Sequence, residues 1–177
     1  MPKGDAGSPV VLVVDDVELN RLILEEILKD SYRILTAENG KAALQVLRNA
    51  EVLPKIILLD VVMPEMNGYQ LLEVMKADET LERIPVIFIT TSTSESEALS
   101  AGAVDFISKP FLPEIVKLRV KNQIELKNYS DSLEEMVAEK TAEATSTLDN
   151  TLQALANIIE YRNLESGSHV KRTQFFL

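Results

Sequence analysis

The stretch VVLVVDD (Val10–Asp16) decides the fold, because five apolar residues in a row run directly into two carboxylates. Two further apolar runs end in polar residues, Ile56–Leu59 at Asp60 and Val86–Ile89 at Thr90. Continuous apolar runs of this length are typical of parallel strands that are buried on both faces. Ligands of open parallel sheets gather outside the carboxyl ends of the strands, so we expect these polar residues to converge there.

A fourth apolar stretch, Val104–Ile107, is followed closely by Lys109. The segments between the runs carry helical patterns, so the chain is organised as five βα units. We therefore expect an α/β fold: a flavodoxin-like five-stranded parallel sheet in the order 2-1-3-4-5, with helices on both faces and a long C-terminal helix after it. This order brings Asp15, Asp16 and Asp60 to the point where strand order reverses.

The expected helices each follow one strand. In the first of them, an apolar face of Leu19, Leu22, Ile23 and Ile27 is predicted to pack on the sheet. The second strand is expected at Tyr32–Ala37, and the remaining helices at Lys41–Arg48, Gly68–Asp78, Ser92–Ala101 and from Pro113 onward.

The residue types at this edge suit phosphoryl transfer. Clustered carboxylates repel one another, so they take up protons or bind a cation, and Mg²⁺ suits a few carboxylates with water and phosphate oxygens. An aspartate can also carry a phosphoryl group as a nucleophile, while an ammonium and a hydroxyl neutralise and bind its oxygens. Taken singly, each residue has an ordinary explanation as a helix cap, a polar loop or a surface lysine. Their joint occurrence favours function.

Four motifs in this order carry a resemblance: VDD (Val14–Asp16), DVVMPEMNG (Asp60–Gly68), IT (Ile89–Thr90) and DFISKPF (Asp105–Phe111). With them the chain resembles the receiver domain of bacterial two-component response regulators, which we expect over residues 9–125. The resemblance implies a sensor histidine kinase as the partner that phosphorylates the chain.

The resemblance also implies residue roles. Asp60 is expected to be the phospho-acceptor. Mg²⁺ is expected to bind Asp15, Asp16, Asp60 and the backbone carbonyl of Val62, with Asp16 the more direct ligand of the first pair.

Thr90 and Lys109 are expected to contact the phosphoryl group, and Thr90 and Phe106 to form the switch, with the ring turning inward on phosphorylation. Pro110 falls where the family has a cis-proline. An apolar Val62 cannot orient an attacking water, so we expect the phosphorylated form to decay slowly.

Composition narrows the class of protein. The 177 residues are 46% hydrophobic, carry a formal net charge of −10 and include no cysteine. The charge argues against a nucleic-acid partner, since phosphate contacts need clustered Lys and Arg. There is no apolar run of ~20 residues, so no membrane insertion is expected, and the N-terminus lacks the apolar region of a signal peptide. We expect a cytoplasmic protein with a disordered N-terminus at residues 1–8.

Residues 126–150 are predicted to form a helical, coiled-coil-like linker. Leu126, Tyr129, Leu133 and Met136 follow a 3-4-3 spacing, and a second seam, offset by one residue, begins at Val137. Such an offset is a register break. We expect a parallel homodimer through this helix or a dimer through a face of the receiver, and the alternative is one exposed helix without a partner.

Residues 151–177 resemble the beginning of an HD-GYP cyclic-di-GMP phosphodiesterase domain, truncated here, in which Glu165 and His169 are possible metal ligands. Asn163 replaces the usual Asp, and the His-Asp and Gly-Tyr-Pro signatures are absent. Two alternatives stay open: the phospho-acceptor box of histidine kinases, which Ser168–Thr173 resembles, and a disordered segment.

The sequence therefore predicts a receiver that relays phosphorylation of Asp60 through a helical linker to a C-terminal output domain. As given, the chain is not a complete enzyme beyond phosphorylation and autodephosphorylation at Asp60. The alternative function is a stand-alone receiver that acts as a phosphotransfer shuttle or adaptor.

Overall fold

The computed structural model describes the backbone of residues 8–90 and 102–173 and the side chains of residues 8–90 and 102–158. The chain divides into two units, Met1–Asn128 and Tyr129–Leu177, with one helix running from the first into the second. The described elements, in chain order, are β1 (Val10–Val14), α1 (Glu18–Leu28), β2 (Arg33–Ala37), α2 (Gly40–Asn49), β3 (Ile56–Asp60), α3 (Gly68–Lys76), β4 (Val86–Thr90), β5 (Asp105–Ser108) and α5 (Pro113–Thr173).

The first unit is built on a five-stranded sheet in the order β2-β1-β3-β4-β5, and every neighbouring pair is parallel. This confirms the predicted flavodoxin-like topology. The register pairs Val14 with Leu59, Asp60 with Ile89, and Thr90 with Ser108, so β1, β3, β4 and β5 end at the same edge of the sheet.

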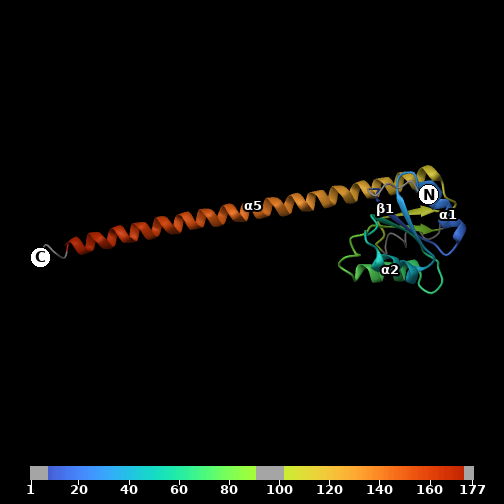
Figure 1. The fold of residues 1–177 in the computed structure, drawn as a ribbon, viewed down its shortest axis with the longest axis horizontal. Coiled ribbons are helices and arrows are strands. Elements are labelled where there is room, and N and C mark those ends of the chain that lie inside the picture. The colour runs from blue at the N-terminus through green and yellow to red at the C-terminus, as the bar shows by residue number, and fades with distance from the viewer. Residues whose placement is uncertain (1–7, 91–101, 174–177) are drawn as a thin grey trace. The chain divides into compact units, whose positions relative to one another are not determined.

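Helices cover both faces of this sheet, and Figure 1 shows α1 and α2 on opposite sides of it. Because successive side chains of a strand point to opposite faces, Leu12 and Val14 pack with α2 and α3, while Val11 and Val13 pack with α1 and the start of α5. The α5 residues in this second cluster are Val116, Val120 and Ile124. Two separate cores explain why the strands are continuous apolar runs.

The prediction of which face of α1 is buried is wrong except at Ile27. The buried residues are Leu24, Ile27 and Leu28, whereas Leu19, Leu22 and Ile23 are 64%, 54% and 37% exposed. The rotation of the helix follows from polar contacts at its start. Asn20 and Arg21, in the first turns of the helix, donate hydrogen bonds to Asp15 at the end of β1. These contacts turn the side of the helix that carries Asn20 and Arg21 toward the edge of the sheet, so the predicted apolar face turns outward.

The start of α3 is specified by its own sequence. Asn67 and Gln70 form a capping box, in which each side chain accepts a hydrogen bond from the other's backbone N–H. Gly68 follows, as predicted, and a Cβ there would lie 2.4 Å from the backbone oxygen of Asp60. The helix ends at Lys76, two residues before the predicted end. The predicted helix at residues 92–101 and residues 1–7 of the predicted disordered N-terminus lie outside the described residues.

The second unit is the continuation of α5, which runs to Thr173. The predicted long C-terminal helix is therefore confirmed. Every described side chain from Glu134 to Ile158 is exposed. Among the described residues, we find no helix that is both long and apolar enough to cross a membrane.

Candidate functional site

Five polar side chains predicted from the sequence come from four strand ends. Asp15 and Asp16 follow β1, Asp60 ends β3, Thr90 ends β4 and Lys109 follows β5. Carboxylate oxygens of the three aspartates all lie within 4.8 Å of one another. The sheet topology thus brings together groups that are up to 94 residues apart along the chain.

Lys109 ties two of these carboxylates together. Its Nζ lies 3.0 Å from Oδ2 of Asp15 and 3.0 Å from Oδ2 of Asp60. The Asp15 side chain is fully buried and that of Asp60 is nearly so, while Lys109 is about one quarter exposed. The peptide bond between Lys109 and Pro110 is cis, as the resemblance implied. One ammonium thus faces two buried carboxylates, and a third carboxylate stands beside them.

Burial and charge shift the pKa values in this cluster. Burial raises the pKa of the Asp60 carboxyl above its ordinary value, and the charge of Asp15 adds to this, while Lys109 opposes it. Burial disfavours the charged form of Lys109. The hydrogen bonds to Asp15 and Asp60 outweigh it, however, so the pKa of Lys109 is raised. Asp60 therefore bears its negative charge at a cost in free energy, which an added cation would lower.

The carboxylates differ in how many contacts they already make. Asp15 accepts hydrogen bonds from Lys109, from the backbone N–H of Val17 and from Asn20, whose Nδ2 lies 2.9 and 3.0 Å from its two oxygens. Asp16 is exposed. Hard carboxylate oxygens on one side of a cluster suit a small divalent cation such as Mg²⁺. Asp16 and Asp60 are therefore better placed than Asp15 to provide oxygen ligands for such a cation.

Sequence reasoning missed two residues of this site. Asn20 binds the Asp15 carboxylate, and Arg21 Nη1 donates to the Asp15 backbone oxygen at 2.6 Å. No local pattern marks them, because they lie on α1 and reach Asp15 only through the turn that joins β1 to α1. They hold the end of β1 in place.

Thr90 and Val62 flank Asp60 in different surroundings. Thr90 is buried, at 4% exposure, and its backbone oxygen accepts a hydrogen bond from the Lys109 N–H at 2.9 Å. Val62 is 78% exposed, in the loop between β3 and α3. In the same loop Glu65 has a positive φ of 63°, a conformation uncommon outside glycine.

Phe106 lies on β5, partly buried against the core formed by α2 and α3. The guanidinium of Arg119 stands 5.2 Å from the centre of its ring, within the range of a cation–π interaction. Arg119 also forms an ion pair with Asp105. Sequence reasoning predicted Phe106 but missed Arg119, which joins the predicted switch residue to α5.

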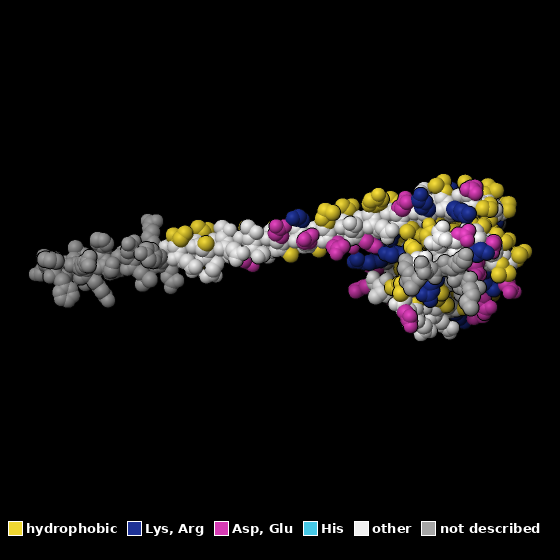
Figure 2. All heavy atoms as spheres, turned by 45° about the horizontal axis from the view of Figure 1, so that its top comes forward, with side chains coloured by type: hydrophobic (Ala, Val, Ile, Leu, Met, Phe, Trp, Pro, Cys, Tyr) yellow, Lys and Arg dark blue, Asp and Glu magenta, His cyan; other side chains and the backbone are white. Residues whose placement is uncertain are grey.

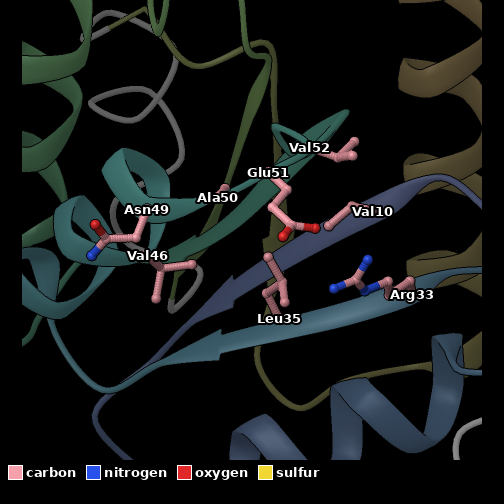
Figure 3. A pocket seen from close by; sticks show the side chains of 8 residues that line it. All are labelled: Val10, Arg33, Leu35, Val46, Asn49, Ala50, Glu51 and Val52. Carbon is pink, nitrogen blue, oxygen red and sulfur yellow. The ribbon is translucent and has the colours of Figure 1, made fainter.

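Two other features concern residues outside the carboxylate cluster. Glu165 and His169 both fall on α5, but their side chains lie outside what the structure describes. A cavity of about 400 Å³ lies near the amino ends of β1 and β2, where Arg33 and Glu51 stand beside apolar residues such as Leu35 (Figure 3). None of the predicted site residues lines this cavity.

Comparison with known proteins identifies the family to which the chain belongs. Residues 11–121 match the response regulator receiver domain, and the chain belongs to this family. Among solved structures, the chain is similar to the chemotaxis response regulator CheY4 of Vibrio cholerae, with a TM-score of 0.60 and 28% identity over 66% of this chain and 98% of that one. NtrX from Brucella abortus has a TM-score of 0.67 and 25% identity, over 73% of this chain and 29% of NtrX.

Two curated relatives extend the comparison. A Vibrio cholerae protein described as "Probable cyclic di-GMP phosphodiesterase" is 36% identical over 100% of this chain. The response regulator PleD of Caulobacter vibrioides is 37% identical over 74% of the chain. The chain spans 42% of the first relative and 29% of the second.

Proposed function

We propose that this receiver accepts a phosphoryl group on Asp60 from the phosphohistidine of a sensor histidine kinase. The observation that carries the proposal is the position of Lys109 Nζ, 3.0 Å from both Asp15 and Asp60 at the meeting point of the strand ends. A carboxylate oxygen of Asp60 attacks the phosphorus, and the P–N bond of the donor breaks. The imidazole nitrogen leaves with the electron pair of that bond.

The other residues neutralise and bind the transferred group. Lys109 pairs with one phosphoryl oxygen, and the Thr90 hydroxyl donates a hydrogen bond to another. Asp15, Asp16, Asp60 and the carbonyl of Val62 would hold Mg²⁺, with Asp16 and Asp60 as the direct carboxylate ligands. When bound, Mg²⁺ supplies positive charge to the phosphoryl oxygens.

Phosphorylation is proposed to act through the switch of Thr90 and Phe106. When Thr90 moves toward the phosphoryl group, the Phe106 ring turns inward and leaves the guanidinium of Arg119. Arg119 lies on α5, the helix that continues into the linker, so loss of its contact with the Phe106 ring would alter the contacts between β5 and this helix.

We propose residues 9–125 as the receiver, residues 126–150 as a helical linker and residues 151–177 as the beginning of an HD-GYP-like output domain, with Glu165 and His169 as metal ligands. The whole cytoplasmic protein would hydrolyse cyclic di-GMP and act as a homodimer. The Vibrio cholerae relative described as "Probable cyclic di-GMP phosphodiesterase" aligns with 100% of this chain, including the linker and the residues after it. This alignment supports a receiver that controls an output domain over a stand-alone shuttle or adaptor.

Phosphorylation of the chain by acetyl phosphate tests the receiver. With Mg²⁺, the wild type should gain one phosphoryl group, detected by intact mass, and Asp60→Asn should gain none. Asp16→Asn should require a higher Mg²⁺ concentration, whereas the matched surface variant Asp30→Asn should behave as the wild type. Phosphorylation of Asp60→Asn at the wild-type rate would contradict the assignment.

Cyclic-di-GMP hydrolysis by the full-length gene product tests the output. The wild type should hydrolyse the dinucleotide, and a His169→Ala variant should lose both activity and bound metal. Full activity and metal content in that variant would contradict the role of His169, while leaving the assignment of Asp60 untouched.

A further inference from the structure

From Leu126 onward, α5 presents an exposed apolar stripe that repeats every eleven residues. Leu126, Val137 and Leu148 are each eleven residues apart, and so are Leu133, Ala144 and Leu155, and Ser130, Thr141 and Leu152. The leucines and the valine of this set are between 51% and 64% exposed. Figure 2 shows hydrophobic side chains recurring along this helix. We call these nine residues the linker stripe.

The linker stripe is continuous where the sequence predicted a register break. Eleven residues make three helical turns at 3.67 residues per turn, so an eleven-residue repeat keeps to one side of a helix that supercoils slightly in the right-handed sense. The predicted offset at Met136 and Val137 then needs no break, because neighbouring residues on the stripe are spaced by four, four and three residues in turn. The stripe differs from the first predicted seam at Tyr129 and Met136, where it runs through Ser130 and Val137 instead. It also runs through Leu152, where the four-three spacing that continues the second seam from Val137 would place Thr151.

The linker stripe contains no charged residue, and its polar members are the hydroxyl residues Ser130 and Thr141. The Thr141 hydroxyl donates to the Val137 backbone oxygen at 2.8 Å, so Thr141 can present its methyl group to a partner without an unpaired donor. The face opposite the stripe is polar and consists of Glu135, Glu139, Ser146, Asn150, Gln153 and Asn157.

The stripe also has the shape that a second helix requires. A shallow, mostly apolar hollow of about 370 Å³ is lined by Ser130, Leu133, Glu134, Val137 and Ala138. The first four of these stand at positions i, i+3, i+4 and i+7, so they form the four corners of one patch of helix surface. In a coiled coil, one side chain of a helix inserts into a hole formed by four residues of the facing helix.

We infer that residues 126–158 pair with a second copy of this chain, parallel and in register, in a coiled coil with an eleven-residue repeat. Only a helix with the same repeat keeps its side chains matched to the holes over these ~50 Å. A second copy carries that repeat and the same uncharged stripe, with Glu135 and Glu139 on its opposite face. The inference deepens the proposed homodimer and rests on it, since the parallel arrangement brings two receivers to one end and two output domains to the other.

Cysteine cross-linking in the whole chain tests the pairing, because the wild type contains no cysteine. Single cysteines at Leu133, Val137, Leu148 and Leu152 should give severalfold more disulfide-linked dimer than the control cysteines at Ser146 and Gln153. Leu152→Cys should also exceed its neighbour Thr151→Cys. An antiparallel pair would cross-link equal positions at one site at most, and that result would overturn the parallel arrangement.

Molar mass by light scattering gives an independent readout. Leu148→Asp should lose the dimer, whereas Asn150→Asp, on the opposite face, should keep it. A monomeric wild type, or equal cross-linking on both faces, would overturn the inference. Either result would leave the stripe as a surface for a different protein. Both measurements are made without a phosphodonor, so their failure is distinguishable from a failure of phosphorylation at Asp60.

Discussion

At the scale of single residues, the site combines charges that oppose one another. In the proposed reaction Asp60 must be negative to act as a nucleophile, yet it is buried beside Asp15, and both effects raise its pKa. Lys109 offsets part of the cost through hydrogen bonds of 3.0 Å to both carboxylates. The remaining excess of negative charge is what would favour a divalent cation at this edge of the sheet.

Asp60→Asn is expected to stabilise the metal-free protein at neutral pH. Because the pKa of Asp60 is raised on folding, its contribution to stability is present below its unfolded pKa and is lost as the pH rises through the folded value. The variant lacks this loss, so its advantage should grow as the pH rises from about 4 toward 8. Urea denaturation across this range measures it, and a variant less stable than the wild type at every pH would contradict the argument.

Val62→Asn is expected to speed decay of the phosphorylated form severalfold. The exposed valine cannot orient an attacking water, whereas an amide can hydrogen-bond one. Substitutions at so exposed a position change stability by only about 0.5 kcal/mol, so folding is unaffected. The measurement is the rate of phosphate release after the phosphodonor is removed, with Val62→Ala as the apolar control. Equal rates in the two variants would contradict the role of the water.

At the scale of secondary-structure elements, the loops that follow the strands decide where the site residues lie. The capping box of Asn67 and Gln70 starts α3 directly after the loop that follows Asp60. Gly68 donates its N–H to the Val61 backbone oxygen at 3.0 Å, which brings the helix against the end of β3. Contacts of Asp15 with Asn20 and Arg21 set the rotation of α1 in the same way.

Gly68→Ala is expected to destabilise the receiver by about 1–3 kcal/mol, the usual cost of overpacking. The added Cβ would lie 2.4 Å from the backbone oxygen of Asp60 and 3.0 Å from Cε1 of Phe88, and neither can move away freely. Val74→Ala, at a partly exposed position on the same helix, is the control and should cost much less. Chemical denaturation measures both, and equal losses would show that the close approach is not what matters.

At the scale of the whole molecule, the two units differ in what stabilises them. The first has a core on each face of its sheet, and the α5 residues of the second core, Val116, Val120 and Ile124, all precede Asn128. The second unit, in contrast, has exposed side chains throughout its described part from Glu134 to Ile158. Isolated helices are marginal in water, so the proposed pairing with a second copy would stabilise the second unit.

A chain that ends after Asn128 is expected to remain folded and to accept phosphate on Asp60, because it keeps both cores and all strand ends. It should be a monomer by light scattering, whereas residues 1–177 should form a dimer with and without Mg²⁺ and beryllofluoride. If the shortened chain dimerised with beryllofluoride, and Asp60→Asn abolished this, the receiver face would be the assembly surface instead.

The class of fold, and the polar residues that meet at the strand ends, could be predicted from the sequence alone. Buried parallel strands need apolar residues on both faces, so β1, β3 and β4 are visible as continuous runs, and the polar residues at their ends are visible as motifs. The capping box of α3 is likewise local, because Asn67 and Gln70 are three residues apart.

The buried face of α1 and the contacts of Asn20 with Asp15 and of Arg119 with Phe106 could not be predicted and are seen only in the folded chain. Each of these features depends on how one element is rotated against another. That rotation results from packing and hydrogen bonds between residues in different elements, for which the spacing of residues along the chain carries no signal. The strand ends could be predicted because topology alone brings them together.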